Sequence, residues 1–428
     1  MKRNIEENFL RFTAKRQAVT SVYPELGRTA WITAQRPARP TLDPSKPHGF
    51  FLEQEFSAVG KVVSSAVILL TNKECPWRCL MCDLWKNTLL DTVQAGAIPV
   101  QIQFALDRFG SHPPQIKLYN SGSFFDPAAI PVADYKAIAE KVSFANRVVV
   151  ECHPRLVGEK AVHFRDLLTQ ARNHGSPQSS NSFRTRNHAE QEFAAPRLEV
   201  AMGLETVHPD VLPRLNKKFN LEHFAMAAQF LQEQQIDLRA FVLIKPPFLD
   251  EVESIEWAVK SAEYAFACGT CAITLIPTRA GNGAMERLLE NNEFAPPNLG
   301  TVEKAFDECL ARFCTQRARS VAAADTPTRN SPSPQPSPSR RGSARGRLFE
   351  DNDCSGSGSA DNSFPLPPNA RVKGNETCVP RRIFVDTWNI EQFSNCPHCF
   401  FERRLRLEQM NLTQRVLPAV SCTFCGGV

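Results

Sequence analysis

The sequence of 428 residues predicts an α/β protein: six parallel strands alternating with helices, followed by a small cysteine-rich tail. Short runs rich in Val, Ile and Leu recur along the chain, and each is followed by a longer helix-like stretch. Three cysteines lie together directly after the first of these runs, and four more lie in two pairs near the carboxyl end. The alternation predicts the fold class, and the cysteines predict two metal centres.

The composition is that of a globular protein, with 42% hydrophobic and 22% charged residues. The net charge of +5 permits an anionic partner such as RNA without requiring one. No run of about 18 apolar residues predicts a membrane span, and the first residues lack the apolar core of a secretory signal. We therefore expect a cytoplasmic protein without membrane attachment. In that reducing compartment its 14 cysteines are expected to be metal ligands or buried thiols, not disulfides.

Each of the six apolar runs is short enough for a strand and apolar on both faces, which is typical of parallel strands beneath an outer layer of helices. Six such units form either a partial barrel or an open doubly wound sheet. The predicted strands cover residues 66–71, 115–120, 147–151, 198–203, 238–244 and 272–277.

The composition divides the chain into four regions. Residues 1–60 are mixed and proline-bearing, and we interpret them as an N-terminal extension of the core at 61–320. Residues 321–375 are rich in Pro, Ser and Gly and predict a disordered linker, because they cannot bury enough apolar surface to fold. The remaining segment, 376–428, is predicted to be a metal-binding tail.

Cys75, Cys79 and Cys82 follow the first predicted strand with the spacing Cys-x3-Cys-x2-Cys. Loops that follow parallel strands gather at the carboxyl edge of a sheet, where functional sites form. Spacing this tight allows one loop to wrap around one iron–sulfur cluster, and three thiolates leave one iron of a four-iron cluster free to bind a ligand. The alternatives are a zinc site completed by a distant histidine, and three unrelated buried thiols.

This cysteine motif resembles that of the radical S-adenosylmethionine (SAM) enzymes. Together with "KLYNSGSFFD" (117–126), "LEVAMGLETVHPDVLPRLNKK" (198–218) and "IPTRAGNGAMERL" (276–288), it resembles the archaeosine-biosynthesis radical SAM proteins, which are relatives of the elongator catalytic subunit. The resemblance implies a partial (β/α)6 barrel and a [4Fe-4S] cluster on the three cysteines. SAM would bind the open iron, and a reductant such as flavodoxin or ferredoxin would drive its cleavage to a 5′-deoxyadenosyl radical. The implied substrate is a modified base in tRNA.

The resemblance also assigns SAM contacts residue by residue. Met81 stands where the family usually has an aromatic residue that packs on the adenine, and its thioether is soft and apolar enough to do the same. The stretch that begins at Asn120 matches the one that holds the SAM amino group, although the glutamate usual there is missing. The full set of expected SAM contacts is Met81, Asn120, Ser121, Gly122, Glu151, Glu205, Lys217 and Gly281.

The tail contains Cys396-x2-Cys399 and, 22 residues later, Cys422-x2-Cys425. Two such pairs predict a zinc ribbon, with a second iron–sulfur cluster as the alternative, since four thiolates serve either metal. Arginines at 403, 404 and 406 lie between the pairs beside two phenylalanines. They form either a surface for RNA phosphates and an unpaired base, or a solvated helix face.

The sequence therefore predicts a radical SAM enzyme that modifies a tRNA base. One alternative is radical SAM chemistry on a small metabolite or a protein. The other is a non-catalytic module that binds RNA through an iron–sulfur cluster and zinc. Intact cysteine spacing and glycine-bearing loops favour an enzyme over this module.

Overall fold

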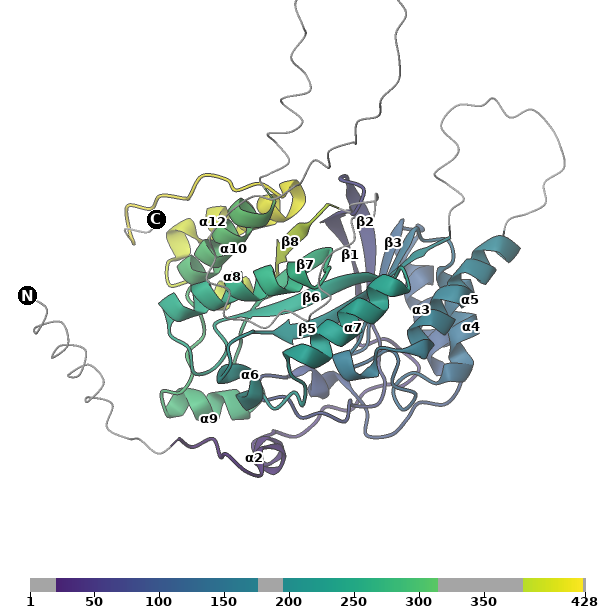
Figure 1. The fold of residues 1–428 in the computed structure, drawn as a ribbon, viewed down its shortest axis with the longest axis horizontal. Coiled ribbons are helices and arrows are strands. Elements are labelled where there is room, and N and C mark those ends of the chain that lie inside the picture. Colours follow the sequence, from purple (N-terminus) through teal and green to yellow (C-terminus); the bar gives the residue numbers. More distant parts are fainter. Residues whose placement is uncertain (1–20, 176–194, 315–379, 426–428) are drawn as a thin grey trace, which may run out of the picture.

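Eight strands form one curved sheet in which each strand pairs with its neighbours along the chain, in the order β1 to β8 (Figure 1). The structure is a computed structural model that describes residues 21–175, 195–314 and 380–425. The predicted linker, 321–375, lies outside the described residues, as do the first 20 residues of the predicted extension.

The six predicted strands are all present and pair in parallel, each with the next. The order never reverses, whereas a doubly wound sheet reverses its order at a switch point. The sheet is therefore a partial barrel, as the family resemblance implied. Its parallel strands are β2 (Val62–Leu69), β3 (Gln115–Tyr119), β4 (Arg147–Glu151), β5 (Arg197–Glu205), β6 (Asp237–Ile244) and β7 (Ala272–Pro277).

Two further strands, which the sequence did not predict, form the edges of the sheet. β1 (Gly49–Phe56) pairs antiparallel with β2, and β8 (Arg382–Val385) pairs parallel with β7. β1 comes from the predicted N-terminal extension and β8 from the predicted tail. Both segments therefore belong to the sheet, while the boundaries predicted between extension, core, linker and tail stay predictions.

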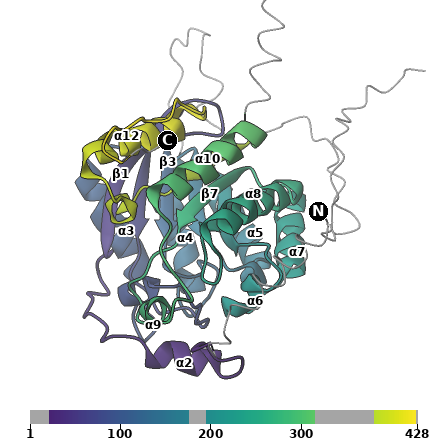
Figure 2. The ribbon, with the colours of Figure 1, turned by 90° about the vertical axis from the view of Figure 1, so that its left-hand side faces the viewer.

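Helices cover the convex face of the sheet, and the main apolar core lies between the two layers (Figures 1 and 2). In both views α2 and α9 lie at one end and α12 at the other. No helix within 21–175, 195–314 or 380–425 is long and apolar enough to cross a membrane. The helices are α2 (Arg28–Ala34), α3 (Ala97–Phe109), α4 (Tyr135–Val142), α5 (Glu159–Gly175), α6 (Val211–Arg214), α7 (Leu221–Glu233), α8 (Glu251–Ala267), α9 (Ala284–Glu290), α10 (Leu299–Phe313) and α12 (Pro397–Thr413).

The concave face of the sheet carries a buried ionic layer at the amino ends of the parallel strands. Glu199 of β5 is fully buried and accepts hydrogen bonds from Arg147 at 2.7 Å, Arg239 at 2.6 Å and Arg382 at 3.2 Å. Arg239 also donates to Glu55 of β1 at 2.7 Å. Burial alone would raise the pKa of Glu199, but the three guanidinium groups hold it far below its usual range. The carboxylate is therefore charged and ties β4, β5, β6 and β8 together.

The outer edge of β8 is occupied by side chains of α12. Asn411 accepts from the backbone N–H of Val385 at 2.8 Å and donates to its carbonyl at 2.9 Å. Gln414 does the same with Ile383, at 2.7 and 2.9 Å. Two carboxamides thus replace a neighbouring strand, so this edge has no free backbone groups at either residue for another chain to pair with.

Side chains close the space between the edge strands β8 and β1. At the amino end, Arg382 lies 4.0 Å from Glu55. Near the carboxyl edge, the ring of Trp388, which follows β8, lies 5.7 Å from that of Phe51 in β1. Arg279, in the loop after β7, donates to the carbonyl of Trp388 at 2.5 Å. The tail therefore forms one wall of the half-barrel.

We expect Glu199→Gln to lower the free energy of unfolding by about 3–5 kcal/mol, because it leaves buried guanidinium groups without their counter-charge. Urea denaturation followed by circular dichroism measures this. The control is Glu290→Gln, which removes an exposed pair with Arg287 and is expected to cost less than about 1 kcal/mol. Equal, small losses in both variants would contradict a structural role for the ionic layer.

Candidate functional site

The three-cysteine loop lies at the carboxyl edge of the half-barrel, between β2 and the short 3-10 helix η1 (Leu84–Asn87). Cys79 is buried, and Cys75 and Cys82 are half-buried. Burial raises the pKa of the Cys79 thiol to about 12, so it is protonated until a metal displaces the proton. The three sulfurs do not all lie within 4.8 Å of one another. As they lie in this structure, the three sulfurs therefore do not form a group as compact as the one in the tail.

Asn282, in the loop after β7, holds this cysteine loop from one side. Its buried amide nitrogen donates to the carbonyls of Leu80 at 2.7 Å and Cys82 at 3.1 Å, and its amide oxygen accepts from the N–H of Met285 at 2.8 Å. One side chain thus satisfies two carbonyls of the cysteine loop and anchors itself at the first turn of α9. The backbone around Cys82 is thereby fixed relative to β7.

The segment after α6 holds the same loop from another side. The N–H of Leu80 donates to the carbonyl of Leu215 at 2.9 Å. The next residue, Asn216, donates from its side chain to the carbonyl of Arg78 at 2.7 Å. Sequence reasoning missed Asn216 and this role of Asn282. Both lie within quoted motifs, but no local pattern indicates that an asparagine will reach a loop far away in the chain.

An aromatic contact completes the support. The Trp77 ring stacks on His153 with centroids 3.7 Å apart and planes 6° apart. Nδ1 of His153 accepts from the N–H of Arg155 at 3.2 Å, so Nε2 carries the proton and donates to the carbonyl of Lys217 at 2.8 Å. Burial lowers the pKa of His153 to about 3, which keeps the ring neutral. His153 therefore acts as a structural link between two loops.

The N-terminal segment holds the beginning of the cysteine loop through Glu74. This carboxylate pairs with Arg36 at 2.7 Å, with Arg39, and with Arg78 at 3.2 Å. Its side chain is nearly buried, at 8% exposed. Cys75 directly follows Glu74 in the chain. Arg36 and Arg39, which lie before β1, therefore help to position Cys75 through Glu74.

The stretch after β3 approaches the cysteine loop closely. A Cβ on Gly122 would lie 3.1 Å from the Cβ of Cys75, so a larger residue would push the two segments apart. The N–H of Gly122 donates to the Glu151 carboxyl group at 3.3 Å. Burial raises the pKa of Glu151 to about 7. Ser121 has a φ of 53°, a strained value for a residue with a side chain. The structure therefore brings the predicted residues of β3 and β4 together beside Cys75.

The side chain of Asn120 is buried but makes no hydrogen bond within the described part of the chain, as expected of a residue that binds a ligand. Its side chain is fully buried, yet neither its amide nitrogen nor its amide oxygen has a partner among the described residues. Buried polar groups are nearly always satisfied, so such an orphan calls for an explanation. A polar ligand at this edge of the sheet would supply the partners.

Lys217 and Glu205, predicted to contact different parts of SAM, form an ion pair with each other. Lys217 also donates to the carbonyl of Gly203 at 3.0 Å. A Cβ on Gly203 would overlap both charged groups, so only glycine leaves room for the pair. Burial alone would lower the pKa of Lys217, but the adjacent Glu205 raises it. The result is a charged, half-buried cation beside the cysteine loop.

Two of the residues predicted to contact SAM, Met81 and Gly281, contact other protein groups in this structure. Met81 is half-buried against two apolar clusters, one containing Met285 and the other Leu215. The carbonyl of Gly281 accepts a hydrogen bond from Lys86, which follows the cysteine loop. Both residues therefore lie next to the cysteine loop, but neither shows an unsatisfied polar group toward a ligand.

The four cysteines of the tail form a compact group. The sulfurs of Cys396 and Cys422 are 3.9 Å apart, those of Cys399 and Cys425 are 3.8 Å apart, and all four lie within 4.8 Å of one another. Metal–sulfur bonds of about 2.3 Å in a tetrahedron separate the sulfurs by about 3.8 Å. The group therefore fits one metal ion.

The tail arginines are not the basic surface that the sequence suggested. Arg403 pairs with Glu303 of α10 at 3.0 Å, and the buried Arg406 pairs with Asp307 of α10 at 2.8 Å. Arg404 alone is largely exposed, and it pairs with a glutamate on its own helix. Arg403 and Arg406 therefore hold α12 against α10. This role differs from both predicted alternatives, an RNA-binding surface and a solvated helix face.

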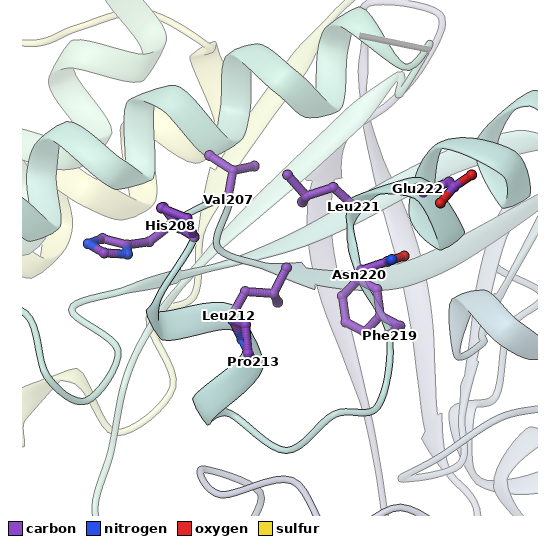
Figure 3. A pocket seen from close by; sticks show the side chains of 9 residues that line it. Val207, His208, Leu212, Pro213, Phe219, Asn220, Leu221 and Glu222 are labelled. Atoms are coloured by element: carbon purple, nitrogen blue, oxygen red, sulfur yellow. The ribbon is translucent and has the colours of Figure 1, made fainter. Parts of the chain in front are cut away.

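Two depressions lie on the described part of the molecule near the supports of the cysteine loop. One, of about 260 Å³, lies between the loop after β5, α6 and the start of α7, and its lining is mostly apolar, with Val207, Leu212 and Phe219 (Figure 3). A larger depression, of about 700 Å³, lies between segments 39–45 and 88–100. None of the predicted site residues lines either one. The candidate site is therefore described from its side chains.

Comparison with known proteins gives distant relatives. No protein-family model matches the chain. The chain is 23% identical over 284 residues to an uncharacterized protein of Methanocaldococcus jannaschii, covering 63% of this chain and 71% of that protein. It is 23% identical over 254 residues to the archaeosine synthase subunit beta of Methanosarcina acetivorans, covering 57% of this chain and 66% of that protein. The relationship to the archaeosine proteins that the motifs predicted is thereby confirmed.

Among solved structures, the Elp3 protein of Methanocaldococcus infernus with an N-terminal deletion is similar over 50% of this chain and 49% of that chain. The sequence identity is 14% and the TM-score is 0.35. The chain therefore spans about half of that structure and about two thirds of the archaeosine synthase subunit.

We expect Asn282→Ala to expose the cysteine loop, because the two carbonyls that Asn282 binds lose their donor. Leaving a buried polar group without its partner costs about 1–3 kcal/mol of stability. In metal-free protein, alkylation of Cys75, Cys79 and Cys82 by iodoacetamide, followed by mass spectrometry, should become roughly 5- to 100-fold faster. Asn291→Ala is the control, because it removes only a bond to the helix carbonyl of Arg287. Equal rates in both variants would show that Asn282 does not hold the loop.

Proposed function

We propose, on the premise that this chain is a radical SAM protein related to the archaeosine synthase beta subunits, that it cleaves SAM reductively to start radical chemistry on a substrate. The observation that carries the proposal is the three-cysteine loop, fixed at the carboxyl edge of a parallel half-barrel beside the unsatisfied side chain of Asn120. When bound, a [4Fe-4S] cluster and SAM supply an electron, a sulfonium and, after cleavage, the 5′-deoxyadenosyl radical.

The residues of the loop fit this cluster. Cys75, Cys79 and Cys82 would be its ligands, with one iron left for SAM. Burial raises the pKa of all three thiols, so loading the site must release protons. The half-buried ammonium of Lys217 would offset part of the negative charge of the thiolates, and its electrostatic influence reaches Cys79 and Cys82.

The residues around the loop also fit SAM. The amide of Asn120 offers one donor and one acceptor, which suits an amino acid group with both an ammonium and a carboxylate. Glu151 can accept from an ammonium, and a bound cation would favour its ionised form. Lys217 already pairs with Glu205. When SAM binds, each of the two residues would either keep this ion pair and contact SAM as well, or replace it with a contact to SAM. Met81 and Gly281 are assigned to SAM by position alone.

For the substrate we propose a modified base in tRNA, with flavodoxin or ferredoxin as the class of reductant. The name of the archaeosine synthase relatives supports an RNA substrate, and the net charge of +5 permits one. The tail arginines give RNA no support, because Arg403 and Arg406 are engaged with α10. The second candidate is therefore radical SAM chemistry on a small metabolite or a protein. A response of SAM cleavage to tRNA separates the two.

For the tail we propose zinc. The sulfur separations of 3.8 and 3.9 Å match a single tetrahedral ion. A cubane cluster, in contrast, binds each thiolate to a different iron and holds the sulfurs farther apart. Zinc would fix the start of α12 to the segment that follows it, and so stabilise the wall between β8 and β1.

After anaerobic reconstitution with iron and sulfide and reduction in the presence of SAM, we expect the protein to form 5′-deoxyadenosine. Cys75→Ala, Cys79→Ala and Cys82→Ala should each abolish it, because a cluster cannot be held by two thiolates. Cys314→Ala, which changes a half-buried thiol at the end of α10, should retain it. Chromatography of the quenched reaction measures the product.

The contrary result is a cluster-loaded protein that forms no 5′-deoxyadenosine with either dithionite or reduced flavodoxin, with and without tRNA. That outcome would favour the non-catalytic RNA-binding module.

In the triple variant Cys75→Ala, Cys79→Ala, Cys82→Ala, we expect one zinc ion per chain by elemental analysis, because the four tail cysteines remain. Cys399→Ser in that background should lower the zinc content to nearly zero. It should also lower the temperature of unfolding, since α12 loses an anchor. Iron with acid-labile sulfide in the triple variant would instead identify a cluster in the tail.

A further inference from the structure

Tyr119 is the last residue of β3, and its side chain lies on the concave face of the half-barrel. Ile116 and Leu118 belong to the apolar core beneath the helices, so the alternate residues, Lys117 and Tyr119, point the other way. Lys117 confirms this direction, because its ammonium group pairs with Glu55 in the ionic layer. Tyr119 therefore lies one step above that layer, toward the carboxyl edge.

The ring of Tyr119 meets Phe241 of β6 across the interior. The ring centroids are 6.3 Å apart and the planes are at 80°, an edge-to-face arrangement. Ala240 and Val242 belong to the outer core, so Phe241 also points inward. β4 and β5 separate the two strands within the sheet. The contact therefore spans the concavity, and both rings are only half-buried there.

The hydroxyl of Tyr119 differs from those of the other tyrosines. The chain has four tyrosines, all within the described residues. Three donate to a backbone carbonyl: Tyr23 to Arg214 at 2.9 Å, Tyr135 to Phe124 at 3.3 Å and Tyr264 to Leu221 at 3.0 Å. Tyr119 differs, because its hydroxyl makes no hydrogen bond with any described residue and the residue as a whole is half-buried.

Packing alone does not account for a tyrosine at this position. A phenylalanine would make the same contact with Phe241 without placing an unpaired hydroxyl inside the sheet. Burial raises the pKa of Tyr119 to about 12, so the phenol is a neutral donor near pH 7. It directly precedes Asn120, the residue whose amide has no partner. The charged groups that act on the phenol include Lys117 and Arg239 of the ionic layer. Tyr119 therefore lies between that layer and the end of β3, where Asn120 follows.

We infer that Tyr119 binds the substrate, by donating a hydrogen bond from its phenol to a carbonyl or ring-nitrogen acceptor of a planar heteroaromatic group that lies against Phe241. This inference rests on the proposed function. The planar heteroaromatic group is the base of a tRNA. Tyr119 would fix the base between the ionic layer and the carboxyl edge, where hydrogen abstraction is proposed. An interior hydrogen-bond donor also discriminates strongly against bases that lack the acceptor.

Tyr119→Phe tests the inference in the cluster-reconstituted full chain, with total tRNA from cells that lack this gene as the probe. We expect the KM for tRNA, measured through SAM cleavage, to rise roughly 2- to 15-fold, as the loss of one hydrogen bond implies. The control, Tyr264→Phe, removes a hydroxyl bound to a backbone carbonyl outside the half-barrel and should leave this KM unchanged. In protein labelled with 3-fluorotyrosine, the ¹⁹F resonance that Tyr119→Phe removes should shift when tRNA is added.

The possible failures are distinguishable. If tRNA stimulates cleavage but neither the KM in Tyr119→Phe nor the assigned resonance changes, the inference is wrong and the proposed function stands. If the wild type cleaves SAM without any response to tRNA, the assignment of a tRNA base to Tyr119 is overturned. If the wild type forms no 5′-deoxyadenosine at all, the proposed function itself fails.

Discussion

The buried carboxylate of Glu199 is the interaction on which the rest of the structure depends. A half-barrel has two edges that backbone hydrogen bonds do not join, and here charged side chains join them at the amino end. Glu199 accepts from arginines of β4, β6 and β8, and through Arg239 the network reaches β1. Forming a buried ion pair of this kind costs desolvation free energy, but removing one partner destabilises the fold strongly because the other charge stays buried and unpaired. They therefore favour this one arrangement of the edge strands over others.

With the amino end fixed, the carboxyl edge can carry polar groups and a loop of buried thiols. The cysteine loop is held by side chains from three separate places: Asn282 after β7, Asn216 after α6, and Glu74 with its arginine partners before β1. None of these residues is expected to touch the cluster. They determine where the thiols lie, in the way that outer contacts orient the ligands of metal sites generally. Asn120, in contrast, has no partner of its own and marks the side where a ligand belongs.

The sequence predicted six strands because their residues are apolar on both faces, a pattern that is local and easily recognised. The predicted strands also carry inward charged residues, such as Glu199 and Arg239, but each still contains a recognisable apolar run. β1 is interrupted by two glutamates, and β8 is only four residues long, Arg382–Val385. A different limit applies to the tail, where arginines that looked solvent-facing pair with α10. The grouping of the four tail cysteines was predictable from their spacing alone, whereas the cluster on the three-cysteine loop stays a prediction. The asparagine supports and Tyr119 were not, because only the folded sheet brings their neighbours together.

The central claim is that the three-cysteine loop holds a cluster with one iron open to SAM. Electron–nuclear double resonance of the reduced, reconstituted protein with SAM labelled by ¹⁵N in the amino group and ¹⁷O in the carboxylate tests it most directly. The account predicts hyperfine coupling from both labels, and none in a sample prepared with unlabelled SAM. A reduced cluster whose spectrum shows neither coupling at saturating SAM would contradict it, because SAM would then not be bound to the iron.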